Sequence, residues 1–128
     1  MVSRRAFLGA SVLAVLAGLA PFRVRAGEAR IIMFTQPGCP YCAAWESEIG
    51  PIWPRTAEGR AYPLSRMDRR DPLPQGVTLA RGVTITPTFV LLVDGEEAGR
   101  VEGYPGEEMF WIFLERMLRQ ADLPPLEG

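Results

Sequence analysis

The chain contains no histidine and no lysine, and its 128 residues include only two cysteines. Without histidine it lacks the commonest general base and the commonest metal ligand. Without lysine it has no side-chain amine for Schiff-base chemistry, and all 14 basic residues are arginines. Two cysteines cannot supply the four ligands of a structural zinc site. These absences argue against a metal site and leave the two cysteines as the groups that could carry chemistry.

Residues 1–26 have the pattern of a secretory leader. Arg4-Arg5 precedes an uncharged stretch at 6–22, and Val24-Arg25-Ala26 has the small residues at the spacing that a signal peptidase reads. The arginine pair followed by Ala-Phe-Leu resembles a twin-arginine signal, with an ordinary secretory leader as the alternative. We therefore expect cleavage near Ala26 and a periplasmic mature protein.

The remaining chain is long enough for one domain, which we expect at 27–120, followed by a flexible tail at 121–128. This mature part would contain ten arginines and all 15 acidic residues, a net charge of −5. A negative chain has no general attraction for phosphate groups. We therefore expect neither nucleic acid nor an anionic membrane surface as the main partner.

The hydrophobic pattern predicts an α/β fold with a small, mixed four-stranded sheet and helices on both faces. An apolar run at 31–34 suits a strand that is buried on both sides. Asp94-Gly95 is a hairpin turn signal, and the apolar residues from Phe110 to Leu118 recur at helical spacing. The expected elements are strands at 28–34, 61–67, 88–93 and 98–102, helices at 40–49 and 77–81, and a terminal helix after Gly106.

Cys39-Pro40-Tyr41-Cys42 falls where the first strand turns into the first helix, and a Cys-x-x-Cys motif there is typical of redox chemistry. A helix N-terminus favours a thiolate, which is the attacking form in thiol–disulfide exchange. We assign Cys39 as the nucleophile and Cys42, one turn further on, as the resolving thiol. The competing reading is a structural disulfide, but so small a loop would constrain the unfolded chain little. No cofactor is expected beyond a redox-active Cys39–Cys42 disulfide.

Thr86-Pro87 is the second candidate element of the site. Proline at the start of an apolar strand marks an edge or an unusual backbone. A cis bond would turn the Thr86 backbone toward Cys39, where it could pair with an extended substrate peptide. Pro40 and Tyr41 would shape the entrance. Glu46, one helical turn beyond Cys42, is the candidate proton shuttle.

Three stretches in this order resemble the landmarks of the thioredoxin superfamily. They are Cys39-Pro40-Tyr41-Cys42 after a strand, the segment 82–88 around Thr86-Pro87, and the hairpin with its following glycine at 93–104. The resemblance implies a thioredoxin fold, with Pro87 cis and facing the cysteine pair. One departure is Met33, which stands where thioredoxins carry a buried acid that helps to deprotonate the resolving cysteine.

Residues 33–64 further resemble the small periplasmic thioredoxin-like proteins of bacterial sulfur-oxidation systems. That resemblance implies a reductase that keeps the cysteine of a partner protein usable. Such a reductase needs electrons where no glutathione pool supplies them, so it implies a membrane electron-transfer protein as a second partner.

Other functions remain open from the residues themselves. The motif does not set the direction of electron flow, so a disulfide-introducing oxidase of the DsbA type and an isomerase are alternatives. A glutaredoxin also uses Cys-Pro-Tyr-Cys, but the sequence after Pro87 lacks a Gly-Gly pair. Two thiolates can also hold Cu(I), which leaves a non-enzymatic copper chaperone as an alternative from another class.

Overall fold

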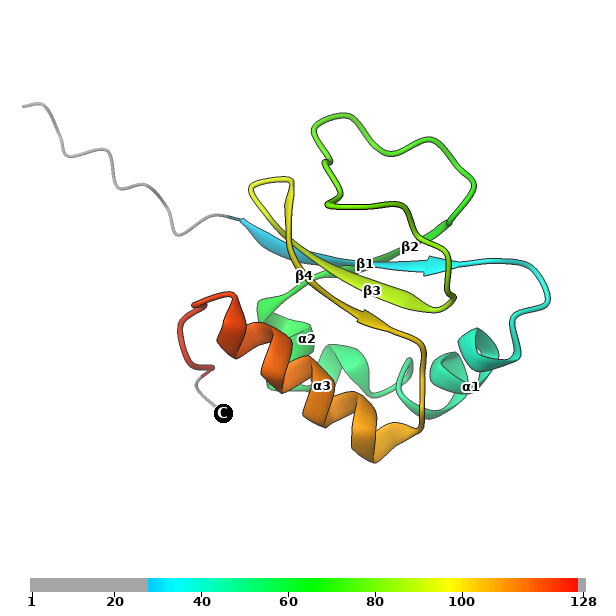
Figure 1. Ribbon diagram of the computed structural model, residues 1–128. Helices are drawn as coiled ribbons and strands as arrows, with labels where there is room; N and C mark the ends of the chain where they lie inside the picture. The colour runs from blue at the N-terminus through cyan, green and yellow to red at the C-terminus, as the bar shows by residue number, and fades with distance from the viewer. Residues whose placement is uncertain (1–27, 127–128) are drawn as a thin grey trace, which may run out of the picture.

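The computed structural model describes residues 28–126, in which all four strands belong to one sheet (Figure 1). The expected leader at 1–26 lies outside these residues. No helix within 28–126 is long and apolar enough to cross a membrane. In chain order the elements are β1 (Ala29–Thr35), α1 (Pro40–Glu48), a 3-10 helix η1 (Trp53–Arg55), α2 (Ala57–Ala61), β2 (Leu64–Asp68), β3 (Thr88–Val93), β4 (Glu96–Glu102) and α3 (Glu107–Gln120).

The sheet has the strand order β2-β1-β3-β4, with β1 in its interior. β1 pairs parallel with β2 and antiparallel with β3, which in turn pairs antiparallel with β4. Ile31, Ile32, Met33 and Phe34 are all buried, because alternate side chains of β1 enter two different apolar clusters. The mixed four-stranded sheet predicted from the sequence is confirmed.

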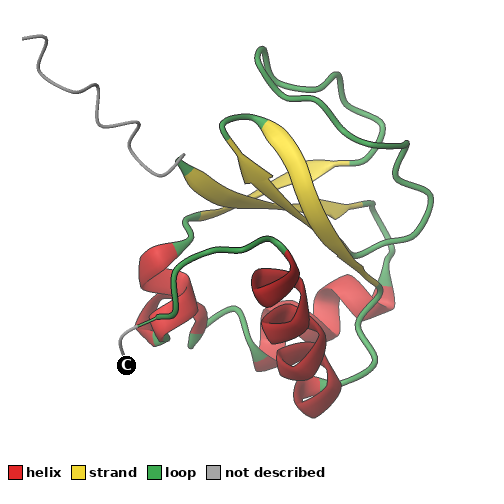
Figure 2. Cartoon of the chain, turned by 60° about the vertical axis from the view of Figure 1, so that its left-hand side comes forward, coloured by secondary structure: helices red, strands yellow, loops and turns green. Residues whose placement is uncertain are grey.

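The helices cover one face of this sheet (Figures 1 and 2). At its centre, the ring centroid of Trp45 from α1 lies 5.2 Å from that of Phe89 in β3 and 5.9 Å from that of Phe110 in α3. The same cluster contains Cys39 and Cys42. The packing of α1 on the sheet therefore positions the cysteine pair.

The opposite face carries no helix within the described range, which corrects the expectation of helices on both faces. It is covered by residues 69–87, here called the connecting segment, whose Val77, Leu79 and Val83 pack on the sheet (Figure 1). The helix expected at 77–81 is absent. Five residues between two glycines would leave most of their backbone groups unpaired in a helix. Instead Thr78 N–H donates to Gly95 C=O at 2.8 Å, and Thr78 C=O accepts from Glu97 N–H at 3.0 Å.

The strand expected at 61–67 is also wrong at its start. Ala61 is the last residue of α2, and the strand begins only at Leu64, after Pro63. Thr56 is the N-cap of α2, because its Oγ1 accepts the Gly59 N–H at 2.9 Å. The sequence pattern did not separate this short helix from the strand that follows it.

The described part of the tail lies against the domain. Leu123 and Leu126 are half-buried and pack on the same cluster as α3. They line a groove together with Ala29, Tyr62 and neighbouring residues at the start of β1. The flexibility expected for 121–128 stays a prediction, but two leucines of this tail contribute to the packed interior.

Candidate functional site

Cys39 and Cys42 form a disulfide at the start of α1, with their Cα atoms 5.3 Å apart. Cys39 is the N-cap of the helix, and its Sγ accepts a hydrogen bond from Cys42 N–H at 3.1 Å. Pro40 occupies the first helical position, where its missing N–H would have no helical partner. Both cysteines are nearly buried, at 9% and 7% exposure. The sequence therefore places one sulfur directly at the unpaired N–H groups of a helix.

That position has a chemical consequence for the reduced protein. The first turn of α1 contains no acidic residue, so nothing in it opposes the positive end of the helix dipole. A thiolate on Cys39 would accept the same N–H groups that the sulfur already faces. With neither lysine nor histidine in the chain, the helix N-terminus is the main source of thiolate stabilisation. The arrangement can therefore support nucleophilic attack by Cys39.

Thr86 and Pro87 directly precede β3. They lie at the same end of the sheet as the loop that connects β1 to Cys39. Phe34 near the end of β1 pairs with Thr88, the first residue of β3, so the two loops leave the sheet side by side (Figure 1). The Thr86–Pro87 peptide bond is cis. Pro87 is buried, and its C=O accepts from Gly103 N–H at 2.7 Å. Within residues 28–126, the N–H and C=O of Thr86 make no hydrogen bond.

Exposed apolar side chains flank the cysteine pair on both loops. Tyr41 is 61% exposed and Ile85 is 47% exposed, and Pro40 is exposed as well. Tyr41 and Pro40 belong to the motif itself, whereas Ile85 precedes Thr86-Pro87.

Glu46, the candidate proton shuttle, is paired with an arginine of β2. Its two carboxylate oxygens accept from Arg66 Nε and Arg66 Nη2, the latter at 3.0 Å. The Arg66 guanidinium also lies over the ring of Trp45, 5.7 Å from its centroid. Met33 is fully buried and stands beside Arg66 in the parallel register. The proton role of Glu46 stays a prediction.

Two polar contacts near the site have no counterpart in the sequence reasoning. Arg69 Nε donates to Gln36 Oε1 at 2.6 Å, which ties the end of β2 to the loop before Cys39. The Tyr104 hydroxyl donates to the Glu48 carboxylate and so links the loop after β4 to α1. Burial, followed by the neighbouring Glu48 carboxylate, raises the pKa of Tyr104 far above its ordinary value. Neither pair has a sequence spacing that indicates contact, because the partners lie 33 and 56 residues apart.

Across the part of the chain that the structure describes, no group of three or more histidine, cysteine, aspartate or glutamate side chains could hold a metal ion. The arrangement consists of a disulfide-bonded cysteine pair at a helix N-terminus and an open backbone at Thr86. Such a pair can exchange disulfides once it is reduced.

Comparison with known proteins decides the family. A family model described as a thioredoxin-like domain matches residues 24–118. The chain belongs to the thioredoxin-like family. It is similar to the crystal structure of the periplasmic thioredoxin SoxS from Paracoccus pantotrophus in its reduced form, at 58% sequence identity and a TM-score of 0.72. The match covers 73% of this chain and 99% of that one. No curated protein sequence matches.

These comparisons confirm two predictions made from the sequence. The superfamily and the resemblance to the thioredoxins of sulfur-oxidation systems are both supported by the match to SoxS. With its Cys39–Cys42 pair, the protein is a thiol–disulfide oxidoreductase. The substrate and the direction of electron flow belong to the proposal that follows.

Proposed function

We propose that this protein is a periplasmic reductase that acts on a disulfide or blocked cysteine of a partner protein. The observation that carries the exchange chemistry is the position of Cys39 Sγ as the cap of α1, where it accepts the Cys42 N–H. The reductive direction is proposed from the similarity to a thioredoxin. The similarity to a periplasmic thioredoxin supports the location. A role in sulfur oxidation follows from the resemblance to the thioredoxins of those systems.

The reaction starts from the reduced dithiol. The Cys39 thiolate attacks one sulfur of the substrate disulfide, forms a mixed disulfide and releases the other substrate sulfur as a thiolate. Cys42, deprotonated, then attacks Cys39 Sγ, which releases the second substrate sulfur and leaves the Cys39–Cys42 disulfide. The substrate gains two electrons, and its two thiolates take up two protons. A membrane dithiol protein would return two electrons to the pair and close the cycle.

The backbone of Thr86 is the proposed binding element for an extended substrate segment. Its unpaired N–H and C=O can pair with a peptide as an additional strand would. Tyr41, Pro40 and Ile85 would contact the substrate side chains. Pro87, buried behind Thr86, holds this backbone at the start of β3.

Proton transfer at Cys42 is assigned to Glu46, the carboxylate one helical turn further along α1. To accept the proton, Glu46 must break a hydrogen bond with Arg66, since both of its carboxylate oxygens accept from that guanidinium. Met33 leaves no carboxylate at the strand position that thioredoxins use. No cofactor other than the dithiol takes part in this proposal.

A partner-trapping experiment tests the function. The mature protein with Cys42→Ser can form the mixed disulfide but cannot resolve it, so we expect a covalent adduct between Cys39 and its periplasmic substrate. The wild-type protein should also reduce insulin disulfides with dithiothreitol as electron donor, and Cys39→Ser should abolish both results. Equal insulin reduction by wild type and Cys39→Ser would disprove the proposal.

The direction of electron flow has its own measurement. A reductase of this fold has a reduction potential of about −270 mV, whereas a disulfide-introducing oxidase has a reduction potential of about −120 mV. We expect equilibration with glutathione or dithiothreitol buffers to give a value toward the reductase end. A value at the oxidase end would favour the DsbA-type alternative for the same cysteine pair.

A further inference from the structure

Thr86 lies near the end of the connecting segment, which has almost no secondary structure. The position of Thr86 therefore depends on how this segment is attached to the rest of the domain. The one regular contact of the segment is an isolated bridge between Thr78 and Glu96. No helix within the described range covers this face of the sheet (Figure 1). Residues 80–82, just before the binding element, therefore need another attachment.

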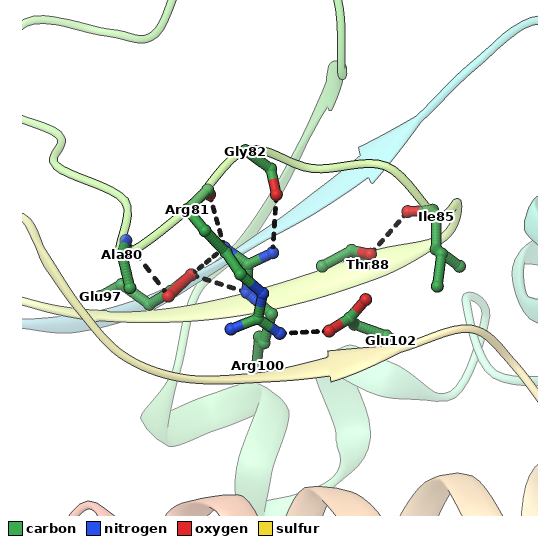
Figure 3. Close-up of polar contacts among 8 residues, drawn as sticks. All are labelled: Ala80, Arg81, Gly82, Ile85, Thr88, Glu97, Arg100 and Glu102. Atoms are coloured by element: carbon green, nitrogen blue, oxygen red, sulfur yellow. Dashed lines mark hydrogen bonds and ion pairs between the residues drawn. The ribbon is translucent and has the colours of Figure 1, made fainter.

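Arg100 of β4 provides that attachment from beneath the segment (Figure 3). Its Nη2 donates to Arg81 C=O at 2.8 Å, and its Nη1 donates to Gly82 C=O at 3.1 Å. Its Nε donates to the Glu97 carboxylate at 2.9 Å. The other oxygen of Glu97 accepts from Ala80 N–H at 3.3 Å. One ion pair thus binds three consecutive residues of the segment through their backbone.

The burial of this pair distinguishes it from the other ion pairs among residues 28–126. The side chains of Arg100 and Glu97 are only 6% and 5% exposed. The neighbouring pair of Arg81 and Glu102 joins the same segment to the same strand, yet Arg81 is 60% exposed. A buried guanidinium with several fixed partners is far more rigid than an exposed pair. The buried pair is therefore the element that holds residues 80–82.

A second attachment holds the other end of the binding element. Thr88 Oγ1 donates to Ile85 C=O at 2.6 Å (Figure 3), and Gly103 N–H donates to Pro87 C=O at 2.7 Å. Between Gly82 and Ile85 the chain has only Val83, which packs on the sheet, and Thr84. The path of Thr86 is therefore set by two attachments, and Arg100 with Glu97 makes the first.

We propose that Arg100 and Glu97 are positioning residues for protein substrates, because they hold the segment whose Thr86 backbone pairs with the substrate. The inference rests on the proposed function of Thr86. Neither residue touches the reacting sulfurs. The reactivity of Cys39 comes from the N-terminus of α1, to which the ion pair makes no hydrogen bond. Loss of the pair should therefore impair protein substrates selectively and leave small disulfides unaffected.

The test uses a double variant of the mature protein, Glu97→Leu with Arg100→Met. Replacing both partners leaves no buried charge without its counter-ion, so the fold is preserved better than by either single change. The matched control is Arg81→Met, which breaks the exposed ion pair between the segment and β4 but removes no hydrogen bond to the segment's backbone. Arg100→Lys is a further variant that keeps the charge of the pair but replaces the fork-shaped guanidinium by a single ammonium.

Three readouts separate positioning from a general structural role. For insulin, we expect the double variant to raise KM so that kcat/KM falls about tenfold, with kcat changed far less. The rate with hydroxyethyl disulfide should stay within about twofold of wild type, since this small substrate needs no strand pairing. Backbone NMR order parameters of residues 83–86 should fall from the range of rigid backbone, about 0.85, to below about 0.6, while those of β1 keep their wild-type values.

Arg81→Met should match wild type in all three measurements, and Arg100→Lys should fall between wild type and the double variant. Equal loss with insulin and hydroxyethyl disulfide would overturn the inference, as would unchanged KM and order parameters in the double variant. Equal loss in Arg81→Met would overturn the assignment of the effect to the buried pair. If the double variant does not fold, Arg100→Lys decides by the same readouts. Wild type that fails to reduce insulin would refute the proposed function, while the order parameters would still test the attachment.

Discussion

At the scale of single residues, the absence of lysine simplifies the alkaline titration of this protein. Arginine keeps its charge throughout, and the cysteines do not titrate while they form a disulfide. This leaves the tyrosine hydroxyl groups, of which the chain has three. Tyr104 stands out among them because burial and the Glu48 carboxylate raise its pKa far above the ordinary 10.0.

Tyr104 should therefore make the oxidised protein less stable as the pH rises above about 10. In that range the unfolded chain releases the Tyr104 proton and the folded chain retains it, so the free energy of unfolding falls with pH. In Tyr104→Phe this fall should be smaller, and Tyr41→Phe, which changes an exposed ring, should keep the wild-type slope. Urea unfolding at a series of pH values measures it, and identical slopes in wild type and Tyr104→Phe would contradict the expectation.

At the scale of elements, α2 depends on a close contact with η1. A Cβ at Gly59 would lie 1.7 Å from Trp53 C=O, although alanine is normally the better helix former. The contact involves backbone atoms, so a small side-chain movement cannot relieve it. We therefore expect alanine to be less stabilising than glycine at position 59, which reverses their usual helix propensities.

Gly59→Ala should lower the free energy of unfolding by about 1–3 kcal/mol, the usual range for overpacking. Gly82→Ala is the matched control because a Cβ there meets no atom within 4 Å. It should stay within about 0.5 kcal/mol of wild type. Chemical denaturation of both variants measures the difference, and a more stable Gly59→Ala would show that η1 can move away.

Sequence reasoning recovered the elements whose local signals are strong. The run of apolar residues in β1, the Asp94-Gly95 turn and the stripe of α3 each identified their element, and the Cys-x-x-Cys motif located the site. It missed that a segment without helices covers one face of the sheet, and it missed the hydrogen bonds of Arg100. These depend on residues far apart in the chain: Arg100 bonds to a carbonyl 19 residues away, and no periodicity indicates such a contact.

At the scale of the whole molecule, the tail extends the hydrophobic core beyond the matched family domain. That domain ends at 118, yet Leu123 and Leu126 still pack on the cluster that contains Cys42 and Trp45. These two leucines cover apolar surface near the start of β1 and the end of α2. They should therefore contribute to global stability.

Leu123→Ala combined with Leu126→Ala should lower the free energy of unfolding by about 1–3 kcal/mol, because both side chains are half-buried. Leu73→Ala is the control: Leu73 is 42% exposed and belongs to neither core cluster. Thermal or urea unfolding of the two proteins provides the comparison. Equal stability of the tail variant and wild type would mean that the tail packing adds nothing.

The two ends of the described chain lie together, on the side of the domain away from the cysteines. Glu28 and Leu126 line the same groove, whereas Cys39 follows the far end of β1 (Figure 1). An affinity tag, a surface tether or a fused second domain attached at either end would therefore leave the dithiol open to a large partner. A protein of this shape can be immobilised without obstructing its own chemistry.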